Sequence, residues 1–326
     1  MALPPNCLAI IDVGHGNCAV LRDGERTILI DAAAGSTLLE FLIQQKITTI
    51  DLVLLSHADK DHIGGLLAVL SSGVCTISQV YVNSDAEKGS ASWDDLLYEL
   101  EQVRRRGGIA FHVGLTAQET GKFDRAPIQI QVAAPTPYLA AKGPGGTDRG
   151  GRKLTSNSLS AVIRILVNGE PVALLAGDID DVGLDDMLAA KPDLIAPLLV
   201  YPHHGGASAA DVDEFAKKLC AEVKPATVVF SVGRGRRMPR PDVVVAVRKY
   251  VREIRVACTQ LSEHCATVLP RTDPTHLNDA FAQGREGRKC CAGTLVIDFA
   301  KPAQLLPTDK SHLTFIAASA PTALCR

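Results

Sequence analysis

Four side chains that can bind a metal ion lie within six residues, directly after an apolar run. They are His57, Asp59, Asp61 and His62, and we call residues 57–62 the metal loop. The preceding residues 52–55 are continuously apolar, as in a buried strand. His57 and Asp59 alternate, so both side chains can leave the strand end on one side, and the other two begin the next element. The spacing predicts ligands aimed at two neighbouring points, as two metal ions about 3.5–4 Å apart require.

An alternative interpretation of this segment is an acidic helix cap with incidental histidines. Asp59 or Asp61 could cap a following helix, but a cap does not need two histidines at this spacing. Gly64 and Gly65 follow directly and would let that helix pack close to the loop. We therefore favour the metal-binding interpretation.

Two further motifs follow apolar runs in the same way. A Gly-Asp step ends the run 172–176, which places Asp178 at the rim of a sheet. Taken alone, Asp178 would more often be a solvated turn residue. A pair of histidines, His203 and His204, follows the run 194–200 and precedes two glycines. The pair favours a ligand over an ordinary loop residue. We expect His204 to bind metal and His203 to contact substrate or support a ligand.

Ordered along the chain, these motifs resemble the metallo-β-lactamase superfamily and, within it, the hydrolase domain of the ComEC/Rec2 competence proteins. The metal loop resembles the superfamily signature His-x-His-x-Asp-His, with Asp in its third place. The other matching segments are Ile11-Asp12-Val13-Gly14-His15-Gly16-Asn17-Cys18, Ile28-Leu29-Ile30-Asp31, Asn157-Ser158-Leu159-Ser160, Leu174-Leu175-Ala176-Gly177-Asp178 and Val200-Tyr201-Pro202-His203-His204-Gly205-Gly206. The resemblance extends along most of the chain.

The resemblance implies an α/β fold, the αββα sandwich, in which mixed sheets carry helices on their outer faces. We expect one hydrolase domain over residues 1–326, with a cysteine-rich insertion at about 258–291. Two divalent ions, Zn²⁺ or Mn²⁺, are implied as cofactors. Asp59 replaces the usual second histidine, and its oxygen extends the preference toward Mn²⁺. The implied metal ligands are His57, Asp59, Asp61, His62, Asp178 and His204.

Other residues have supporting roles in this comparison. The resemblance implies that Asp31 supports the metal loop and that Asp178 bridges both metals. Asn157 stands nearest the place where the wider family has its third-motif ligand. His15 lies in a turn near the expected site, where it would support a ligand or contact substrate.

Arginines gather just after the apolar run 227–232. They are Arg234, Arg236, Arg237 and Arg240. Arg240-Pro241 stands where the competence group has His-Pro, so a cation replaces a histidine there. Arg240, Arg237 and Lys153 are candidates for stabilising charge on a phosphate. Solvated surface charge is the alternative interpretation of the cluster.

The implied activity is a metal-dependent hydrolase, a phosphodiesterase or nuclease acting on DNA. Its catalytic residues would be Asp61, Asp178, His203 and Arg240. A hydrolase of a small phosphoryl or carboxylic ester or amide is one alternative, and a non-catalytic scaffold that retains the fold is a second. By analogy only, a protein partner would belong to a DNA-processing or defence system. The sequence does not predict the oligomeric state.

Nine cysteines form a separate signal. Four of them bracket a turn-rich, loop-like segment and could bind one structural Zn²⁺ tetrahedrally. They are Cys258, Cys265, Cys290 and Cys291. Buried thiols or an oxidised pair are the alternatives. The other five look like scattered buried or terminal thiols.

Periodicity predicts helices over residues 37–45, 63–70, 92–106, 213–222 and 242–251. Asp23-Gly24 and Asn168-Gly169 are hairpin signals. Because hairpins occur beside alternating strands and helices, a mixed sheet fits better than a parallel one.

Composition adds limits on the class of protein. Hydrophobic residues make up 46% and charged residues 21% of the chain, as in ordinary globular proteins. The net charge of −2 excludes a uniformly basic nucleic-acid coat but permits a local basic groove. No apolar run approaches the roughly 20 residues of a membrane helix, and no signal-peptide pattern is seen. We expect a soluble, cytoplasmic protein with reduced thiols and no membrane partner.

Overall fold

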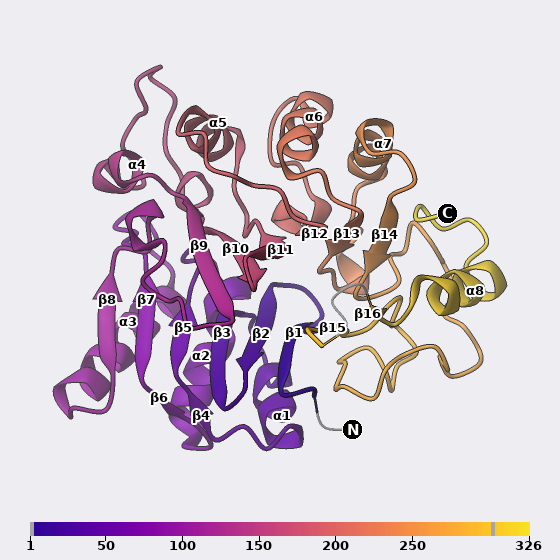
Figure 1. Cartoon of the computed structure of the whole chain (residues 1–326), viewed down its shortest axis with the longest axis horizontal. Coiled ribbons are helices and arrows are strands. Elements are labelled where there is room, and N and C mark those ends of the chain that lie inside the picture. The colour runs from indigo at the N-terminus through magenta and orange to yellow at the C-terminus, as the bar shows by residue number, and fades with distance from the viewer. Residues whose placement is uncertain (1–2, 301–303) are drawn as a thin grey trace.

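Two β-sheets face each other, and helices cover their outer sides (Figure 1). This arrangement comes from a computed structural model, which describes residues 3–300 and 304–326. The α/β fold with mixed sheets and outer helices predicted from the sequence is confirmed. Among the described residues, no helix is both long enough and apolar enough to cross a membrane.

The first sheet combines antiparallel and parallel pairing. At one end of the sheet, the neighbouring strands β16, β15, β1, β2 and β3 pair antiparallel. At the other end, β3, β5, β7 and β8 pair parallel. In spatial order, its described strands are β16 (Leu305–Leu306), β15 (Leu295–Asp298), β1 (Asn6–Ile10), β2 (Cys18–Asp23), β3 (Arg26–Ala32), β5 (Leu52–Leu54), β7 (Gln79–Val82) and β8 (Ala110–Val113). A small separate pair is formed by β4 (Thr49–Ile50) and β6 (Thr76–Ile77).

The second sheet is also mixed. The order of its described strands is β14 (Arg255–Cys258), β13 (Thr227–Phe230), β12 (Leu198–Val200), β11 (Glu170–Leu175), β10 (Val162–Val167) and β9 (Ile128–Ala134). The strands from β11 to β14 are parallel, and β9, β10 and β11 pair antiparallel. The β10–β11 hairpin turns at Asn168 and Gly169, as the Asn-Gly step predicts.

Helices pack on the outer face of each sheet (Figure 1). The first sheet carries α1 (Thr37–Gln44), α2 (Lys60–Ser72) and α3 (Ala91–Arg105); the second carries α5 (Asp181–Ala189), α6 (Val212–Val223) and α7 (Pro241–Tyr250). The remaining helices of the described chain are α4 (Pro137–Lys142) and α8 (Asp309–Ser319), with short 3₁₀ turns at η1 (Ala117–Glu119), η2 (Asn157–Leu159), η3 (Pro202–Gly205) and η4 (Arg234–Arg236).

Alternation along the strands separates the buried apolar side chains into layers. Leu29 of β3 points into the cluster under α1, α2 and α3, while its neighbours Ile28 and Ile30 join the cluster between the sheets. On β10, Val162 lies in the cluster beneath α5, α6 and α7, and Ile163 faces the other sheet. Each sheet is therefore apolar on both faces, which explains why its strands read as continuous apolar runs.

Helix α2 begins earlier than its apolar periodicity predicts. It starts at Lys60, and Asp59 is its N-cap residue, so the last three residues of the metal loop lie in its first turn. An alanine β-carbon at position 65 would lie 2.3 Å from the carbonyl oxygen of Ala33. Gly65 therefore allows α2 to approach β3 closely, as expected from the sequence.

The segment between β14 and β15 contains no helix or strand among its described residues. It includes residues 258–291, which we continue to call the cysteine-rich insertion, and it lies beside β14 and α8 (Figure 1). Helix α8 itself was not predicted from the sequence. Only His312 and Ile316 of this helix are buried, so its amphipathic pattern is weak.

Candidate metal centre

The candidate ligands converge from the loops that follow three parallel strands. The metal loop follows β5, Asp178 follows β11, and His204 follows β12. Because the first strand belongs to one sheet and the other two to the facing sheet, the site spans both halves of the sandwich. His15 reaches it from the loop between β1 and β2.

One group of donors lies deep in the protein. The Nε2 atoms of His57 and His62 lie 3.9 and 3.3 Å from carboxylate oxygens of Asp178. All three residues are buried, and their donor atoms lie within 4.8 Å of one another. Two imidazoles and one carboxylate at this separation can surround a divalent ion.

A second group lies beside the first and is closer to solvent. The Nε2 atoms of His204 and His15 lie 3.2 and 3.4 Å from Oδ2 of Asp61. These donor atoms also lie within 4.8 Å of one another. Oδ2 of Asp178 is 3.6 Å from Nε2 of His204, so this carboxylate lies between the two groups.

Unsatisfied nitrogen atoms test whether the site fits cations. The Nε2 atoms of His57, His62 and His204 are buried, and none has a hydrogen-bond partner in the described part of the chain. Burying a polar atom without a partner costs free energy. Three such atoms facing carboxylates are what a metal site without its ion would contain, so the residues present fit divalent metals.

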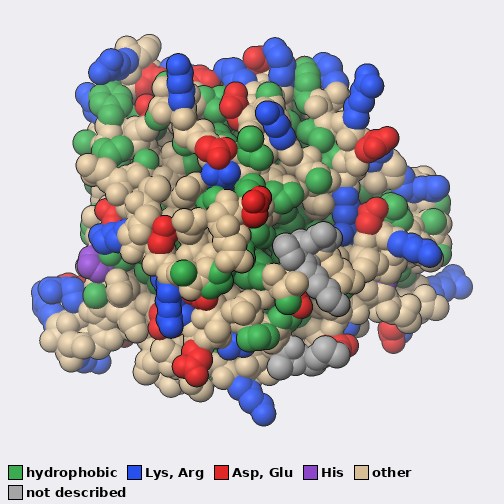
Figure 2. Space-filling view, in the orientation of Figure 1, with side chains coloured by type: hydrophobic (Ala, Val, Ile, Leu, Met, Phe, Trp, Pro, Cys, Tyr) green, Lys and Arg blue, Asp and Glu red, His purple; other side chains and the backbone are tan. Residues whose placement is uncertain are grey.

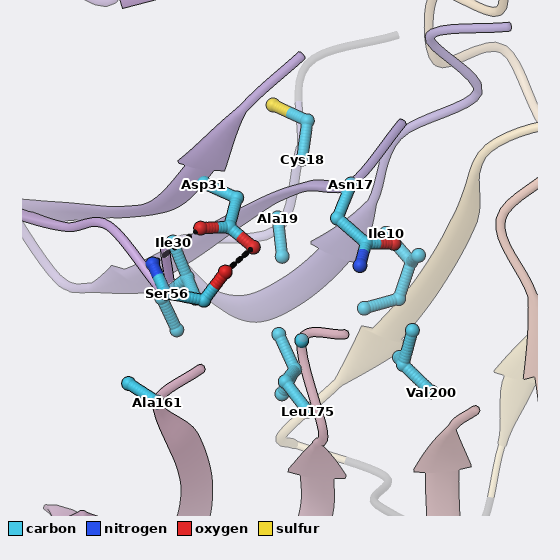
Figure 3. A pocket seen from close by; sticks show the side chains of 11 residues that line it. Ile10, Asn17, Cys18, Ala19, Ile30, Asp31, Ser56, Ala161, Leu175 and Val200 are labelled. Atoms are coloured by element: carbon cyan, nitrogen blue, oxygen red, sulfur yellow. Dashed lines mark hydrogen bonds between the residues drawn. The ribbon is translucent and has the colours of Figure 1, made fainter. Parts of the chain in front are cut away.

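The opposite ring nitrogens are held by hydrogen bonds, which orient the rings. Nδ1 of His62 donates to Asp31 at 2.8 Å. The Ser56 hydroxyl donates to the same carboxylate, as Figure 3 shows. Nδ1 of His57 lies 3.0 Å from the Ser56 hydroxyl, and Nδ1 of His204 lies 2.9 Å from the carbonyl oxygen of Ser231. With the proton on Nδ1, each Nε2 presents a lone pair to the centre.

The electrostatics of the cluster follow from burial and proximity. Burial, together with the neighbouring His62, lowers the pKa of His57 to about 4. Burial also lowers the pKa of His62, but the carboxylates of Asp178 and Asp31 outweigh it and raise that pKa well above its usual value. Conversely, burial opposes ionisation of Asp178, yet His62 and His204 hold its pKa well below the usual range. Asp178 is therefore an anion.

Asp59 and His203 lie at the margin of the centre. Asp59 forms an ion pair with Lys88, and its Oδ1 is 3.8 Å from Nε2 of His57. Nδ1 of His203 lies 3.0 Å from Oδ2 of Asp178, and its side chain is 29% exposed. Both histidines of the pair have positive φ, because the chain turns sharply here before Gly205. The turn sends His204 inward and leaves His203 at the opening.

The candidate phosphate-binding cations have other partners. Lys153 pairs with Glu87, Arg237 with Glu263, and Arg240 with Asp242 at the start of α7. Arg234 donates to three carbonyl oxygens of the cysteine-rich insertion. Arg236 differs from these, because its exposed side chain has no hydrogen bond or ion pair with any described residue.

Burial, the nearby His204 and the Arg236 cation contribute to lowering the pKa of His15 to about 4.

The Asn-x-x-Ser segment supports the centre mainly through its serine. The backbone N–H of Asp178 donates to Oγ of Ser160 at 2.9 Å, and this hydroxyl lies 3.4 Å from Nδ1 of His57. Asn157 lies in η2 and is outside both donor groups. Its Oδ1 is buried without a hydrogen-bond partner among the described residues.

Of the four cysteines selected from the sequence, Cys258, Cys265 and Cys291 lie near one another, whereas Cys290 has a different partner. Cys291 lies 3.1 Å from Nε2 of His312, and its thiol interacts with those of Cys258 and Cys325. Cys290 instead donates to Asp12 at 3.3 Å. Cys265 is close enough to Cys325 to affect the pKa of its thiol.

Sequence reasoning missed two contributors to this region. Cys325 was classed as a scattered thiol because it is 34 residues from Cys291 and lies in no motif. Ser231 belongs to a Ser-Val-Gly segment that resembles the competence group, but its carbonyl contact with His204 was not predicted. Only the fold brings these residues to their partners.

The comparisons with known proteins agree on the family. The sequence profile of the metallo-beta-lactamase superfamily matches residues 11–215. Solved structures similar to this chain include the metallo-beta-lactamase fold protein YhfI from Bacillus subtilis, with 11% identity, 77% of this chain and 96% of that one covered, and a TM-score of 0.46. The metallo hydrolase Igni18 from Ignicoccus hospitalis has 18% identity, coverage of 78% and 95%, and a TM-score of 0.45.

A third similar structure is Tm1679, described as a metal-dependent hydrolase of the beta-lactamase superfamily, with 17% identity, coverage of 78% and 96%, and a TM-score of 0.46. No curated protein matches the sequence. The profile match covers more than half of the chain, including the metal loop, Asp178 and both histidines of the pair. The chain therefore belongs to the metallo-beta-lactamase superfamily, and it has the donor set of a metal-dependent hydrolase.

Proposed function

We propose that the protein is a metal-dependent phosphodiesterase, of the ComEC/Rec2-like type, that cleaves DNA. The observation that carries the proposal is the position of Asp178 between two groups that each contain two imidazoles. When bound at such a site, two divalent cations make a water molecule acidic and polarise an ester oxygen. Zn²⁺ and Mn²⁺ both suit this mixture of imidazole and carboxylate donors.

The residues around the donors have distinct tasks in this proposal. Asp61 and Asp178 bring negative charge that holds the cations, and Asp61 also orients the attacking water. His203 lies at the opening, with Nδ1 hydrogen-bonded to Asp178. The neighbouring Asp178 carboxylate raises the pKa of His203, which favours the protonated ring. His203 would then donate its Nε2 proton to the departing alkoxide of the ester.

The charge of Arg236, unpaired among the described residues, is the observation that supports an anionic substrate. Arg236 lies near His15 at the edge of the centre, whereas the Arg240 guanidinium is engaged by Asp242. We therefore assign phosphate contact to Arg236 before Arg240. On the face seen in Figure 2, Lys and Arg side chains alternate with Asp and Glu and form no continuous basic surface.

Cleavage assays on linear, circular and single-stranded DNA with Mn²⁺ or Zn²⁺ test the proposal. We expect cleavage that a chelator abolishes and that His57→Ala lowers at least about 100-fold. Arg236→Gln should raise KM more than Arg240→Gln does, and it should reduce the salt dependence of binding. Arg105→Gln is the control, since this exposed residue pairs with Glu101 on α3.

Two outcomes would decide against nuclease activity. Hydrolysis of small phosphate or carboxylic esters without cleavage of any DNA would favour a small-substrate hydrolase. A lack of hydrolysis with every substrate, while metals are bound, would favour a scaffold that retains the fold.

A further inference from the structure

We propose that His15 is a metal ligand, which completes the second donor group beside Asp61 and His204. His15 lies in the loop between β1 and β2. The sequence motifs of the site do not identify it as a metal ligand. The inference rests on the metal-dependent function proposed above only in assuming that two ions bind. It does not depend on which bond is cleaved.

The geometry places His15 among donors and not merely near them. Its Nε2 atom is 3.4 Å from Oδ2 of Asp61, and its ring centroid is 4.6 Å from that of His204. A separation of 3.4 Å is long for a nitrogen–oxygen hydrogen bond, but it suits two atoms that share one cation. Its other ring nitrogen, Nδ1, is buried and has no hydrogen-bond partner among the described residues. No second hydrogen bond therefore explains the orientation of the ring.

The loop that carries His15 is fixed on the side of the metal loop. The backbone N–H of Asn17 donates to the carbonyl oxygen of Asp61 at 3.1 Å. Gly16 has a φ of +126°, and a β-carbon there would lie 2.3 Å from the same oxygen. Oγ of Ser231, whose own carbonyl orients His204, donates to the carbonyl oxygen of Gly16 at 2.7 Å. The backbone of this loop thus contacts the segments that supply Asp61 and His204.

A buried carboxylate fixes the other side of the same loop. Asp12 is fully buried and accepts hydrogen bonds from the backbone N–H of Gly14 and of Gly284. Gln260 and Cys290 donate to it as well, at 2.9 and 3.3 Å. Three of these donors belong to the cysteine-rich insertion, which therefore supports the position of His15. A loop whose backbone is held on both sides presents its side chain in a fixed place, as a metal ligand needs.

The donor count gives the proposal its specific consequence. With His15, each group has two imidazoles and one carboxylate, and the two ions have similar surroundings. Without His15, the second group keeps only Asp61 and His204 as its own donors, next to the shared Asp178. Loss of His15 should therefore weaken the binding of one ion. It should leave unchanged the binding of the other ion, which is held by His57 and His62.

Calorimetric titration of the metal-free, full-length protein with Zn²⁺, in the absence of substrate, tests this inference. We expect two equivalents to bind at the two donor groups of the unsubstituted protein, apart from any zinc held by the cysteines. His15→Ala should keep one equivalent at unchanged affinity and lose at least about 30-fold in affinity for the other. His15→Gln should behave like His15→Ala, because an amide can hydrogen-bond to Asp61 but is a poor zinc ligand. When Co²⁺ replaces Zn²⁺, His15→Ala should change the visible absorption of one of the two bound ions relative to the unsubstituted protein.

His112→Ala is the matched control, since this ring stacks on Tyr81 away from the centre. Unchanged binding of both equivalents by His15→Ala would overturn the proposal. Zinc binding by His15→Gln as tight as in the unsubstituted protein would also overturn the proposal. That result would show that His15 acts through a hydrogen bond. A protein that binds two equivalents but cleaves no DNA would refute the proposed function and leave the role of His15 intact. Thermal unfolding of each variant checks that it is folded.

Discussion

Nδ1 of His62 lies 2.8 Å from Oδ2 of Asp31, a residue that itself has a positive φ of 57°. The same carboxylate accepts hydrogen bonds from the backbone and the hydroxyl of Ser56. Asp31→Asn should lower metal affinity by about 10- to 100-fold, because a neutral amide supports the imidazole less well. Asparagine tolerates the left-handed backbone, so the fold should persist. Zinc titration checks this, with Asp51→Asn as control, since the Asp51 carboxylate accepts a hydrogen bond from the backbone N–H of Thr27.

Gly65 determines how closely α2 approaches β3. Gly65→Ala would put a β-carbon 2.3 Å from the carbonyl oxygen of Ala33, so the helix would have to shift. We expect a loss of about 1–3 kcal/mol in the free energy of unfolding. Urea denaturation measures it. Gly89→Ala, where a β-carbon would meet nothing within 4 Å, should change stability by less than about 0.5 kcal/mol. Equal effects of the two substitutions would contradict the explanation.

Arg164 is a buried cation in β10, with its side chain only 4% exposed. It donates to Gln131 and to the carbonyl oxygen of Ile195, and it pairs with Asp193. Arg164→Met should cost about 2–4 kcal/mol of unfolding free energy, because buried acceptors lose their donor. Asp193→Asn should cost less than about 1 kcal/mol, since Asp193 is 62% exposed. The same denaturation experiment distinguishes the two.

The structural zinc predicted from the cysteines also has a direct test. We expect one zinc equivalent beyond the catalytic pair, and Cys291→Ser should remove it. Cys75→Ser should retain it, because Cys75 is a buried thiol that donates to the carbonyl oxygen of Ile47. Metal analysis of the purified variants gives the result. The same zinc content in both variants would contradict the prediction and would mean that the cysteines are buried thiols that bind no zinc.

Metal binding should stabilise the whole protein, since the donors come from both sheets. At a metal concentration 100 times the dissociation constant, the gain is about 2.7 kcal/mol for each site. Thermal unfolding with and without a chelator should show it. His57→Ala/Asp178→Ala should abolish the difference. A midpoint that does not change with metal would mean that the folded and unfolded chains bind metal equally well.

The ligand loops could be predicted because they follow apolar strands. Charged residues are costly inside such a run, so Asp178 or His204 just after one marks the rim of the sheet. The hairpin at Asn168-Gly169 was predictable for a similar local reason, since this dipeptide accepts the positive φ that the turn needs. These features depend on neighbours in sequence.

Other features depend on pairing across the fold, and the sequence could not predict them. The arginine cluster looked uniform, yet Arg234 binds carbonyl oxygens of the insertion, and of its four side chains only Arg236 has no hydrogen bond or ion pair with a described residue. Helix α5 was missed because it contains Gly183 and its apolar residues are not confined to one face. That glycine packs against the carbonyl oxygen of Ser158, which no local pattern reveals.

The antiparallel pairing of β1 with β15 has a consequence for biosynthesis. Residues Cys7 to Ile10 pair with residues Asp298 to Leu295, so one edge of β1 has no partner until nearly the entire chain has left the ribosome. An apolar strand with a free edge is prone to pair with other chains. Newly made protein should therefore depend on rapid completion or on chaperone protection during this interval. Expression of either half alone should yield aggregates, even though each half contains a sheet and its own helices.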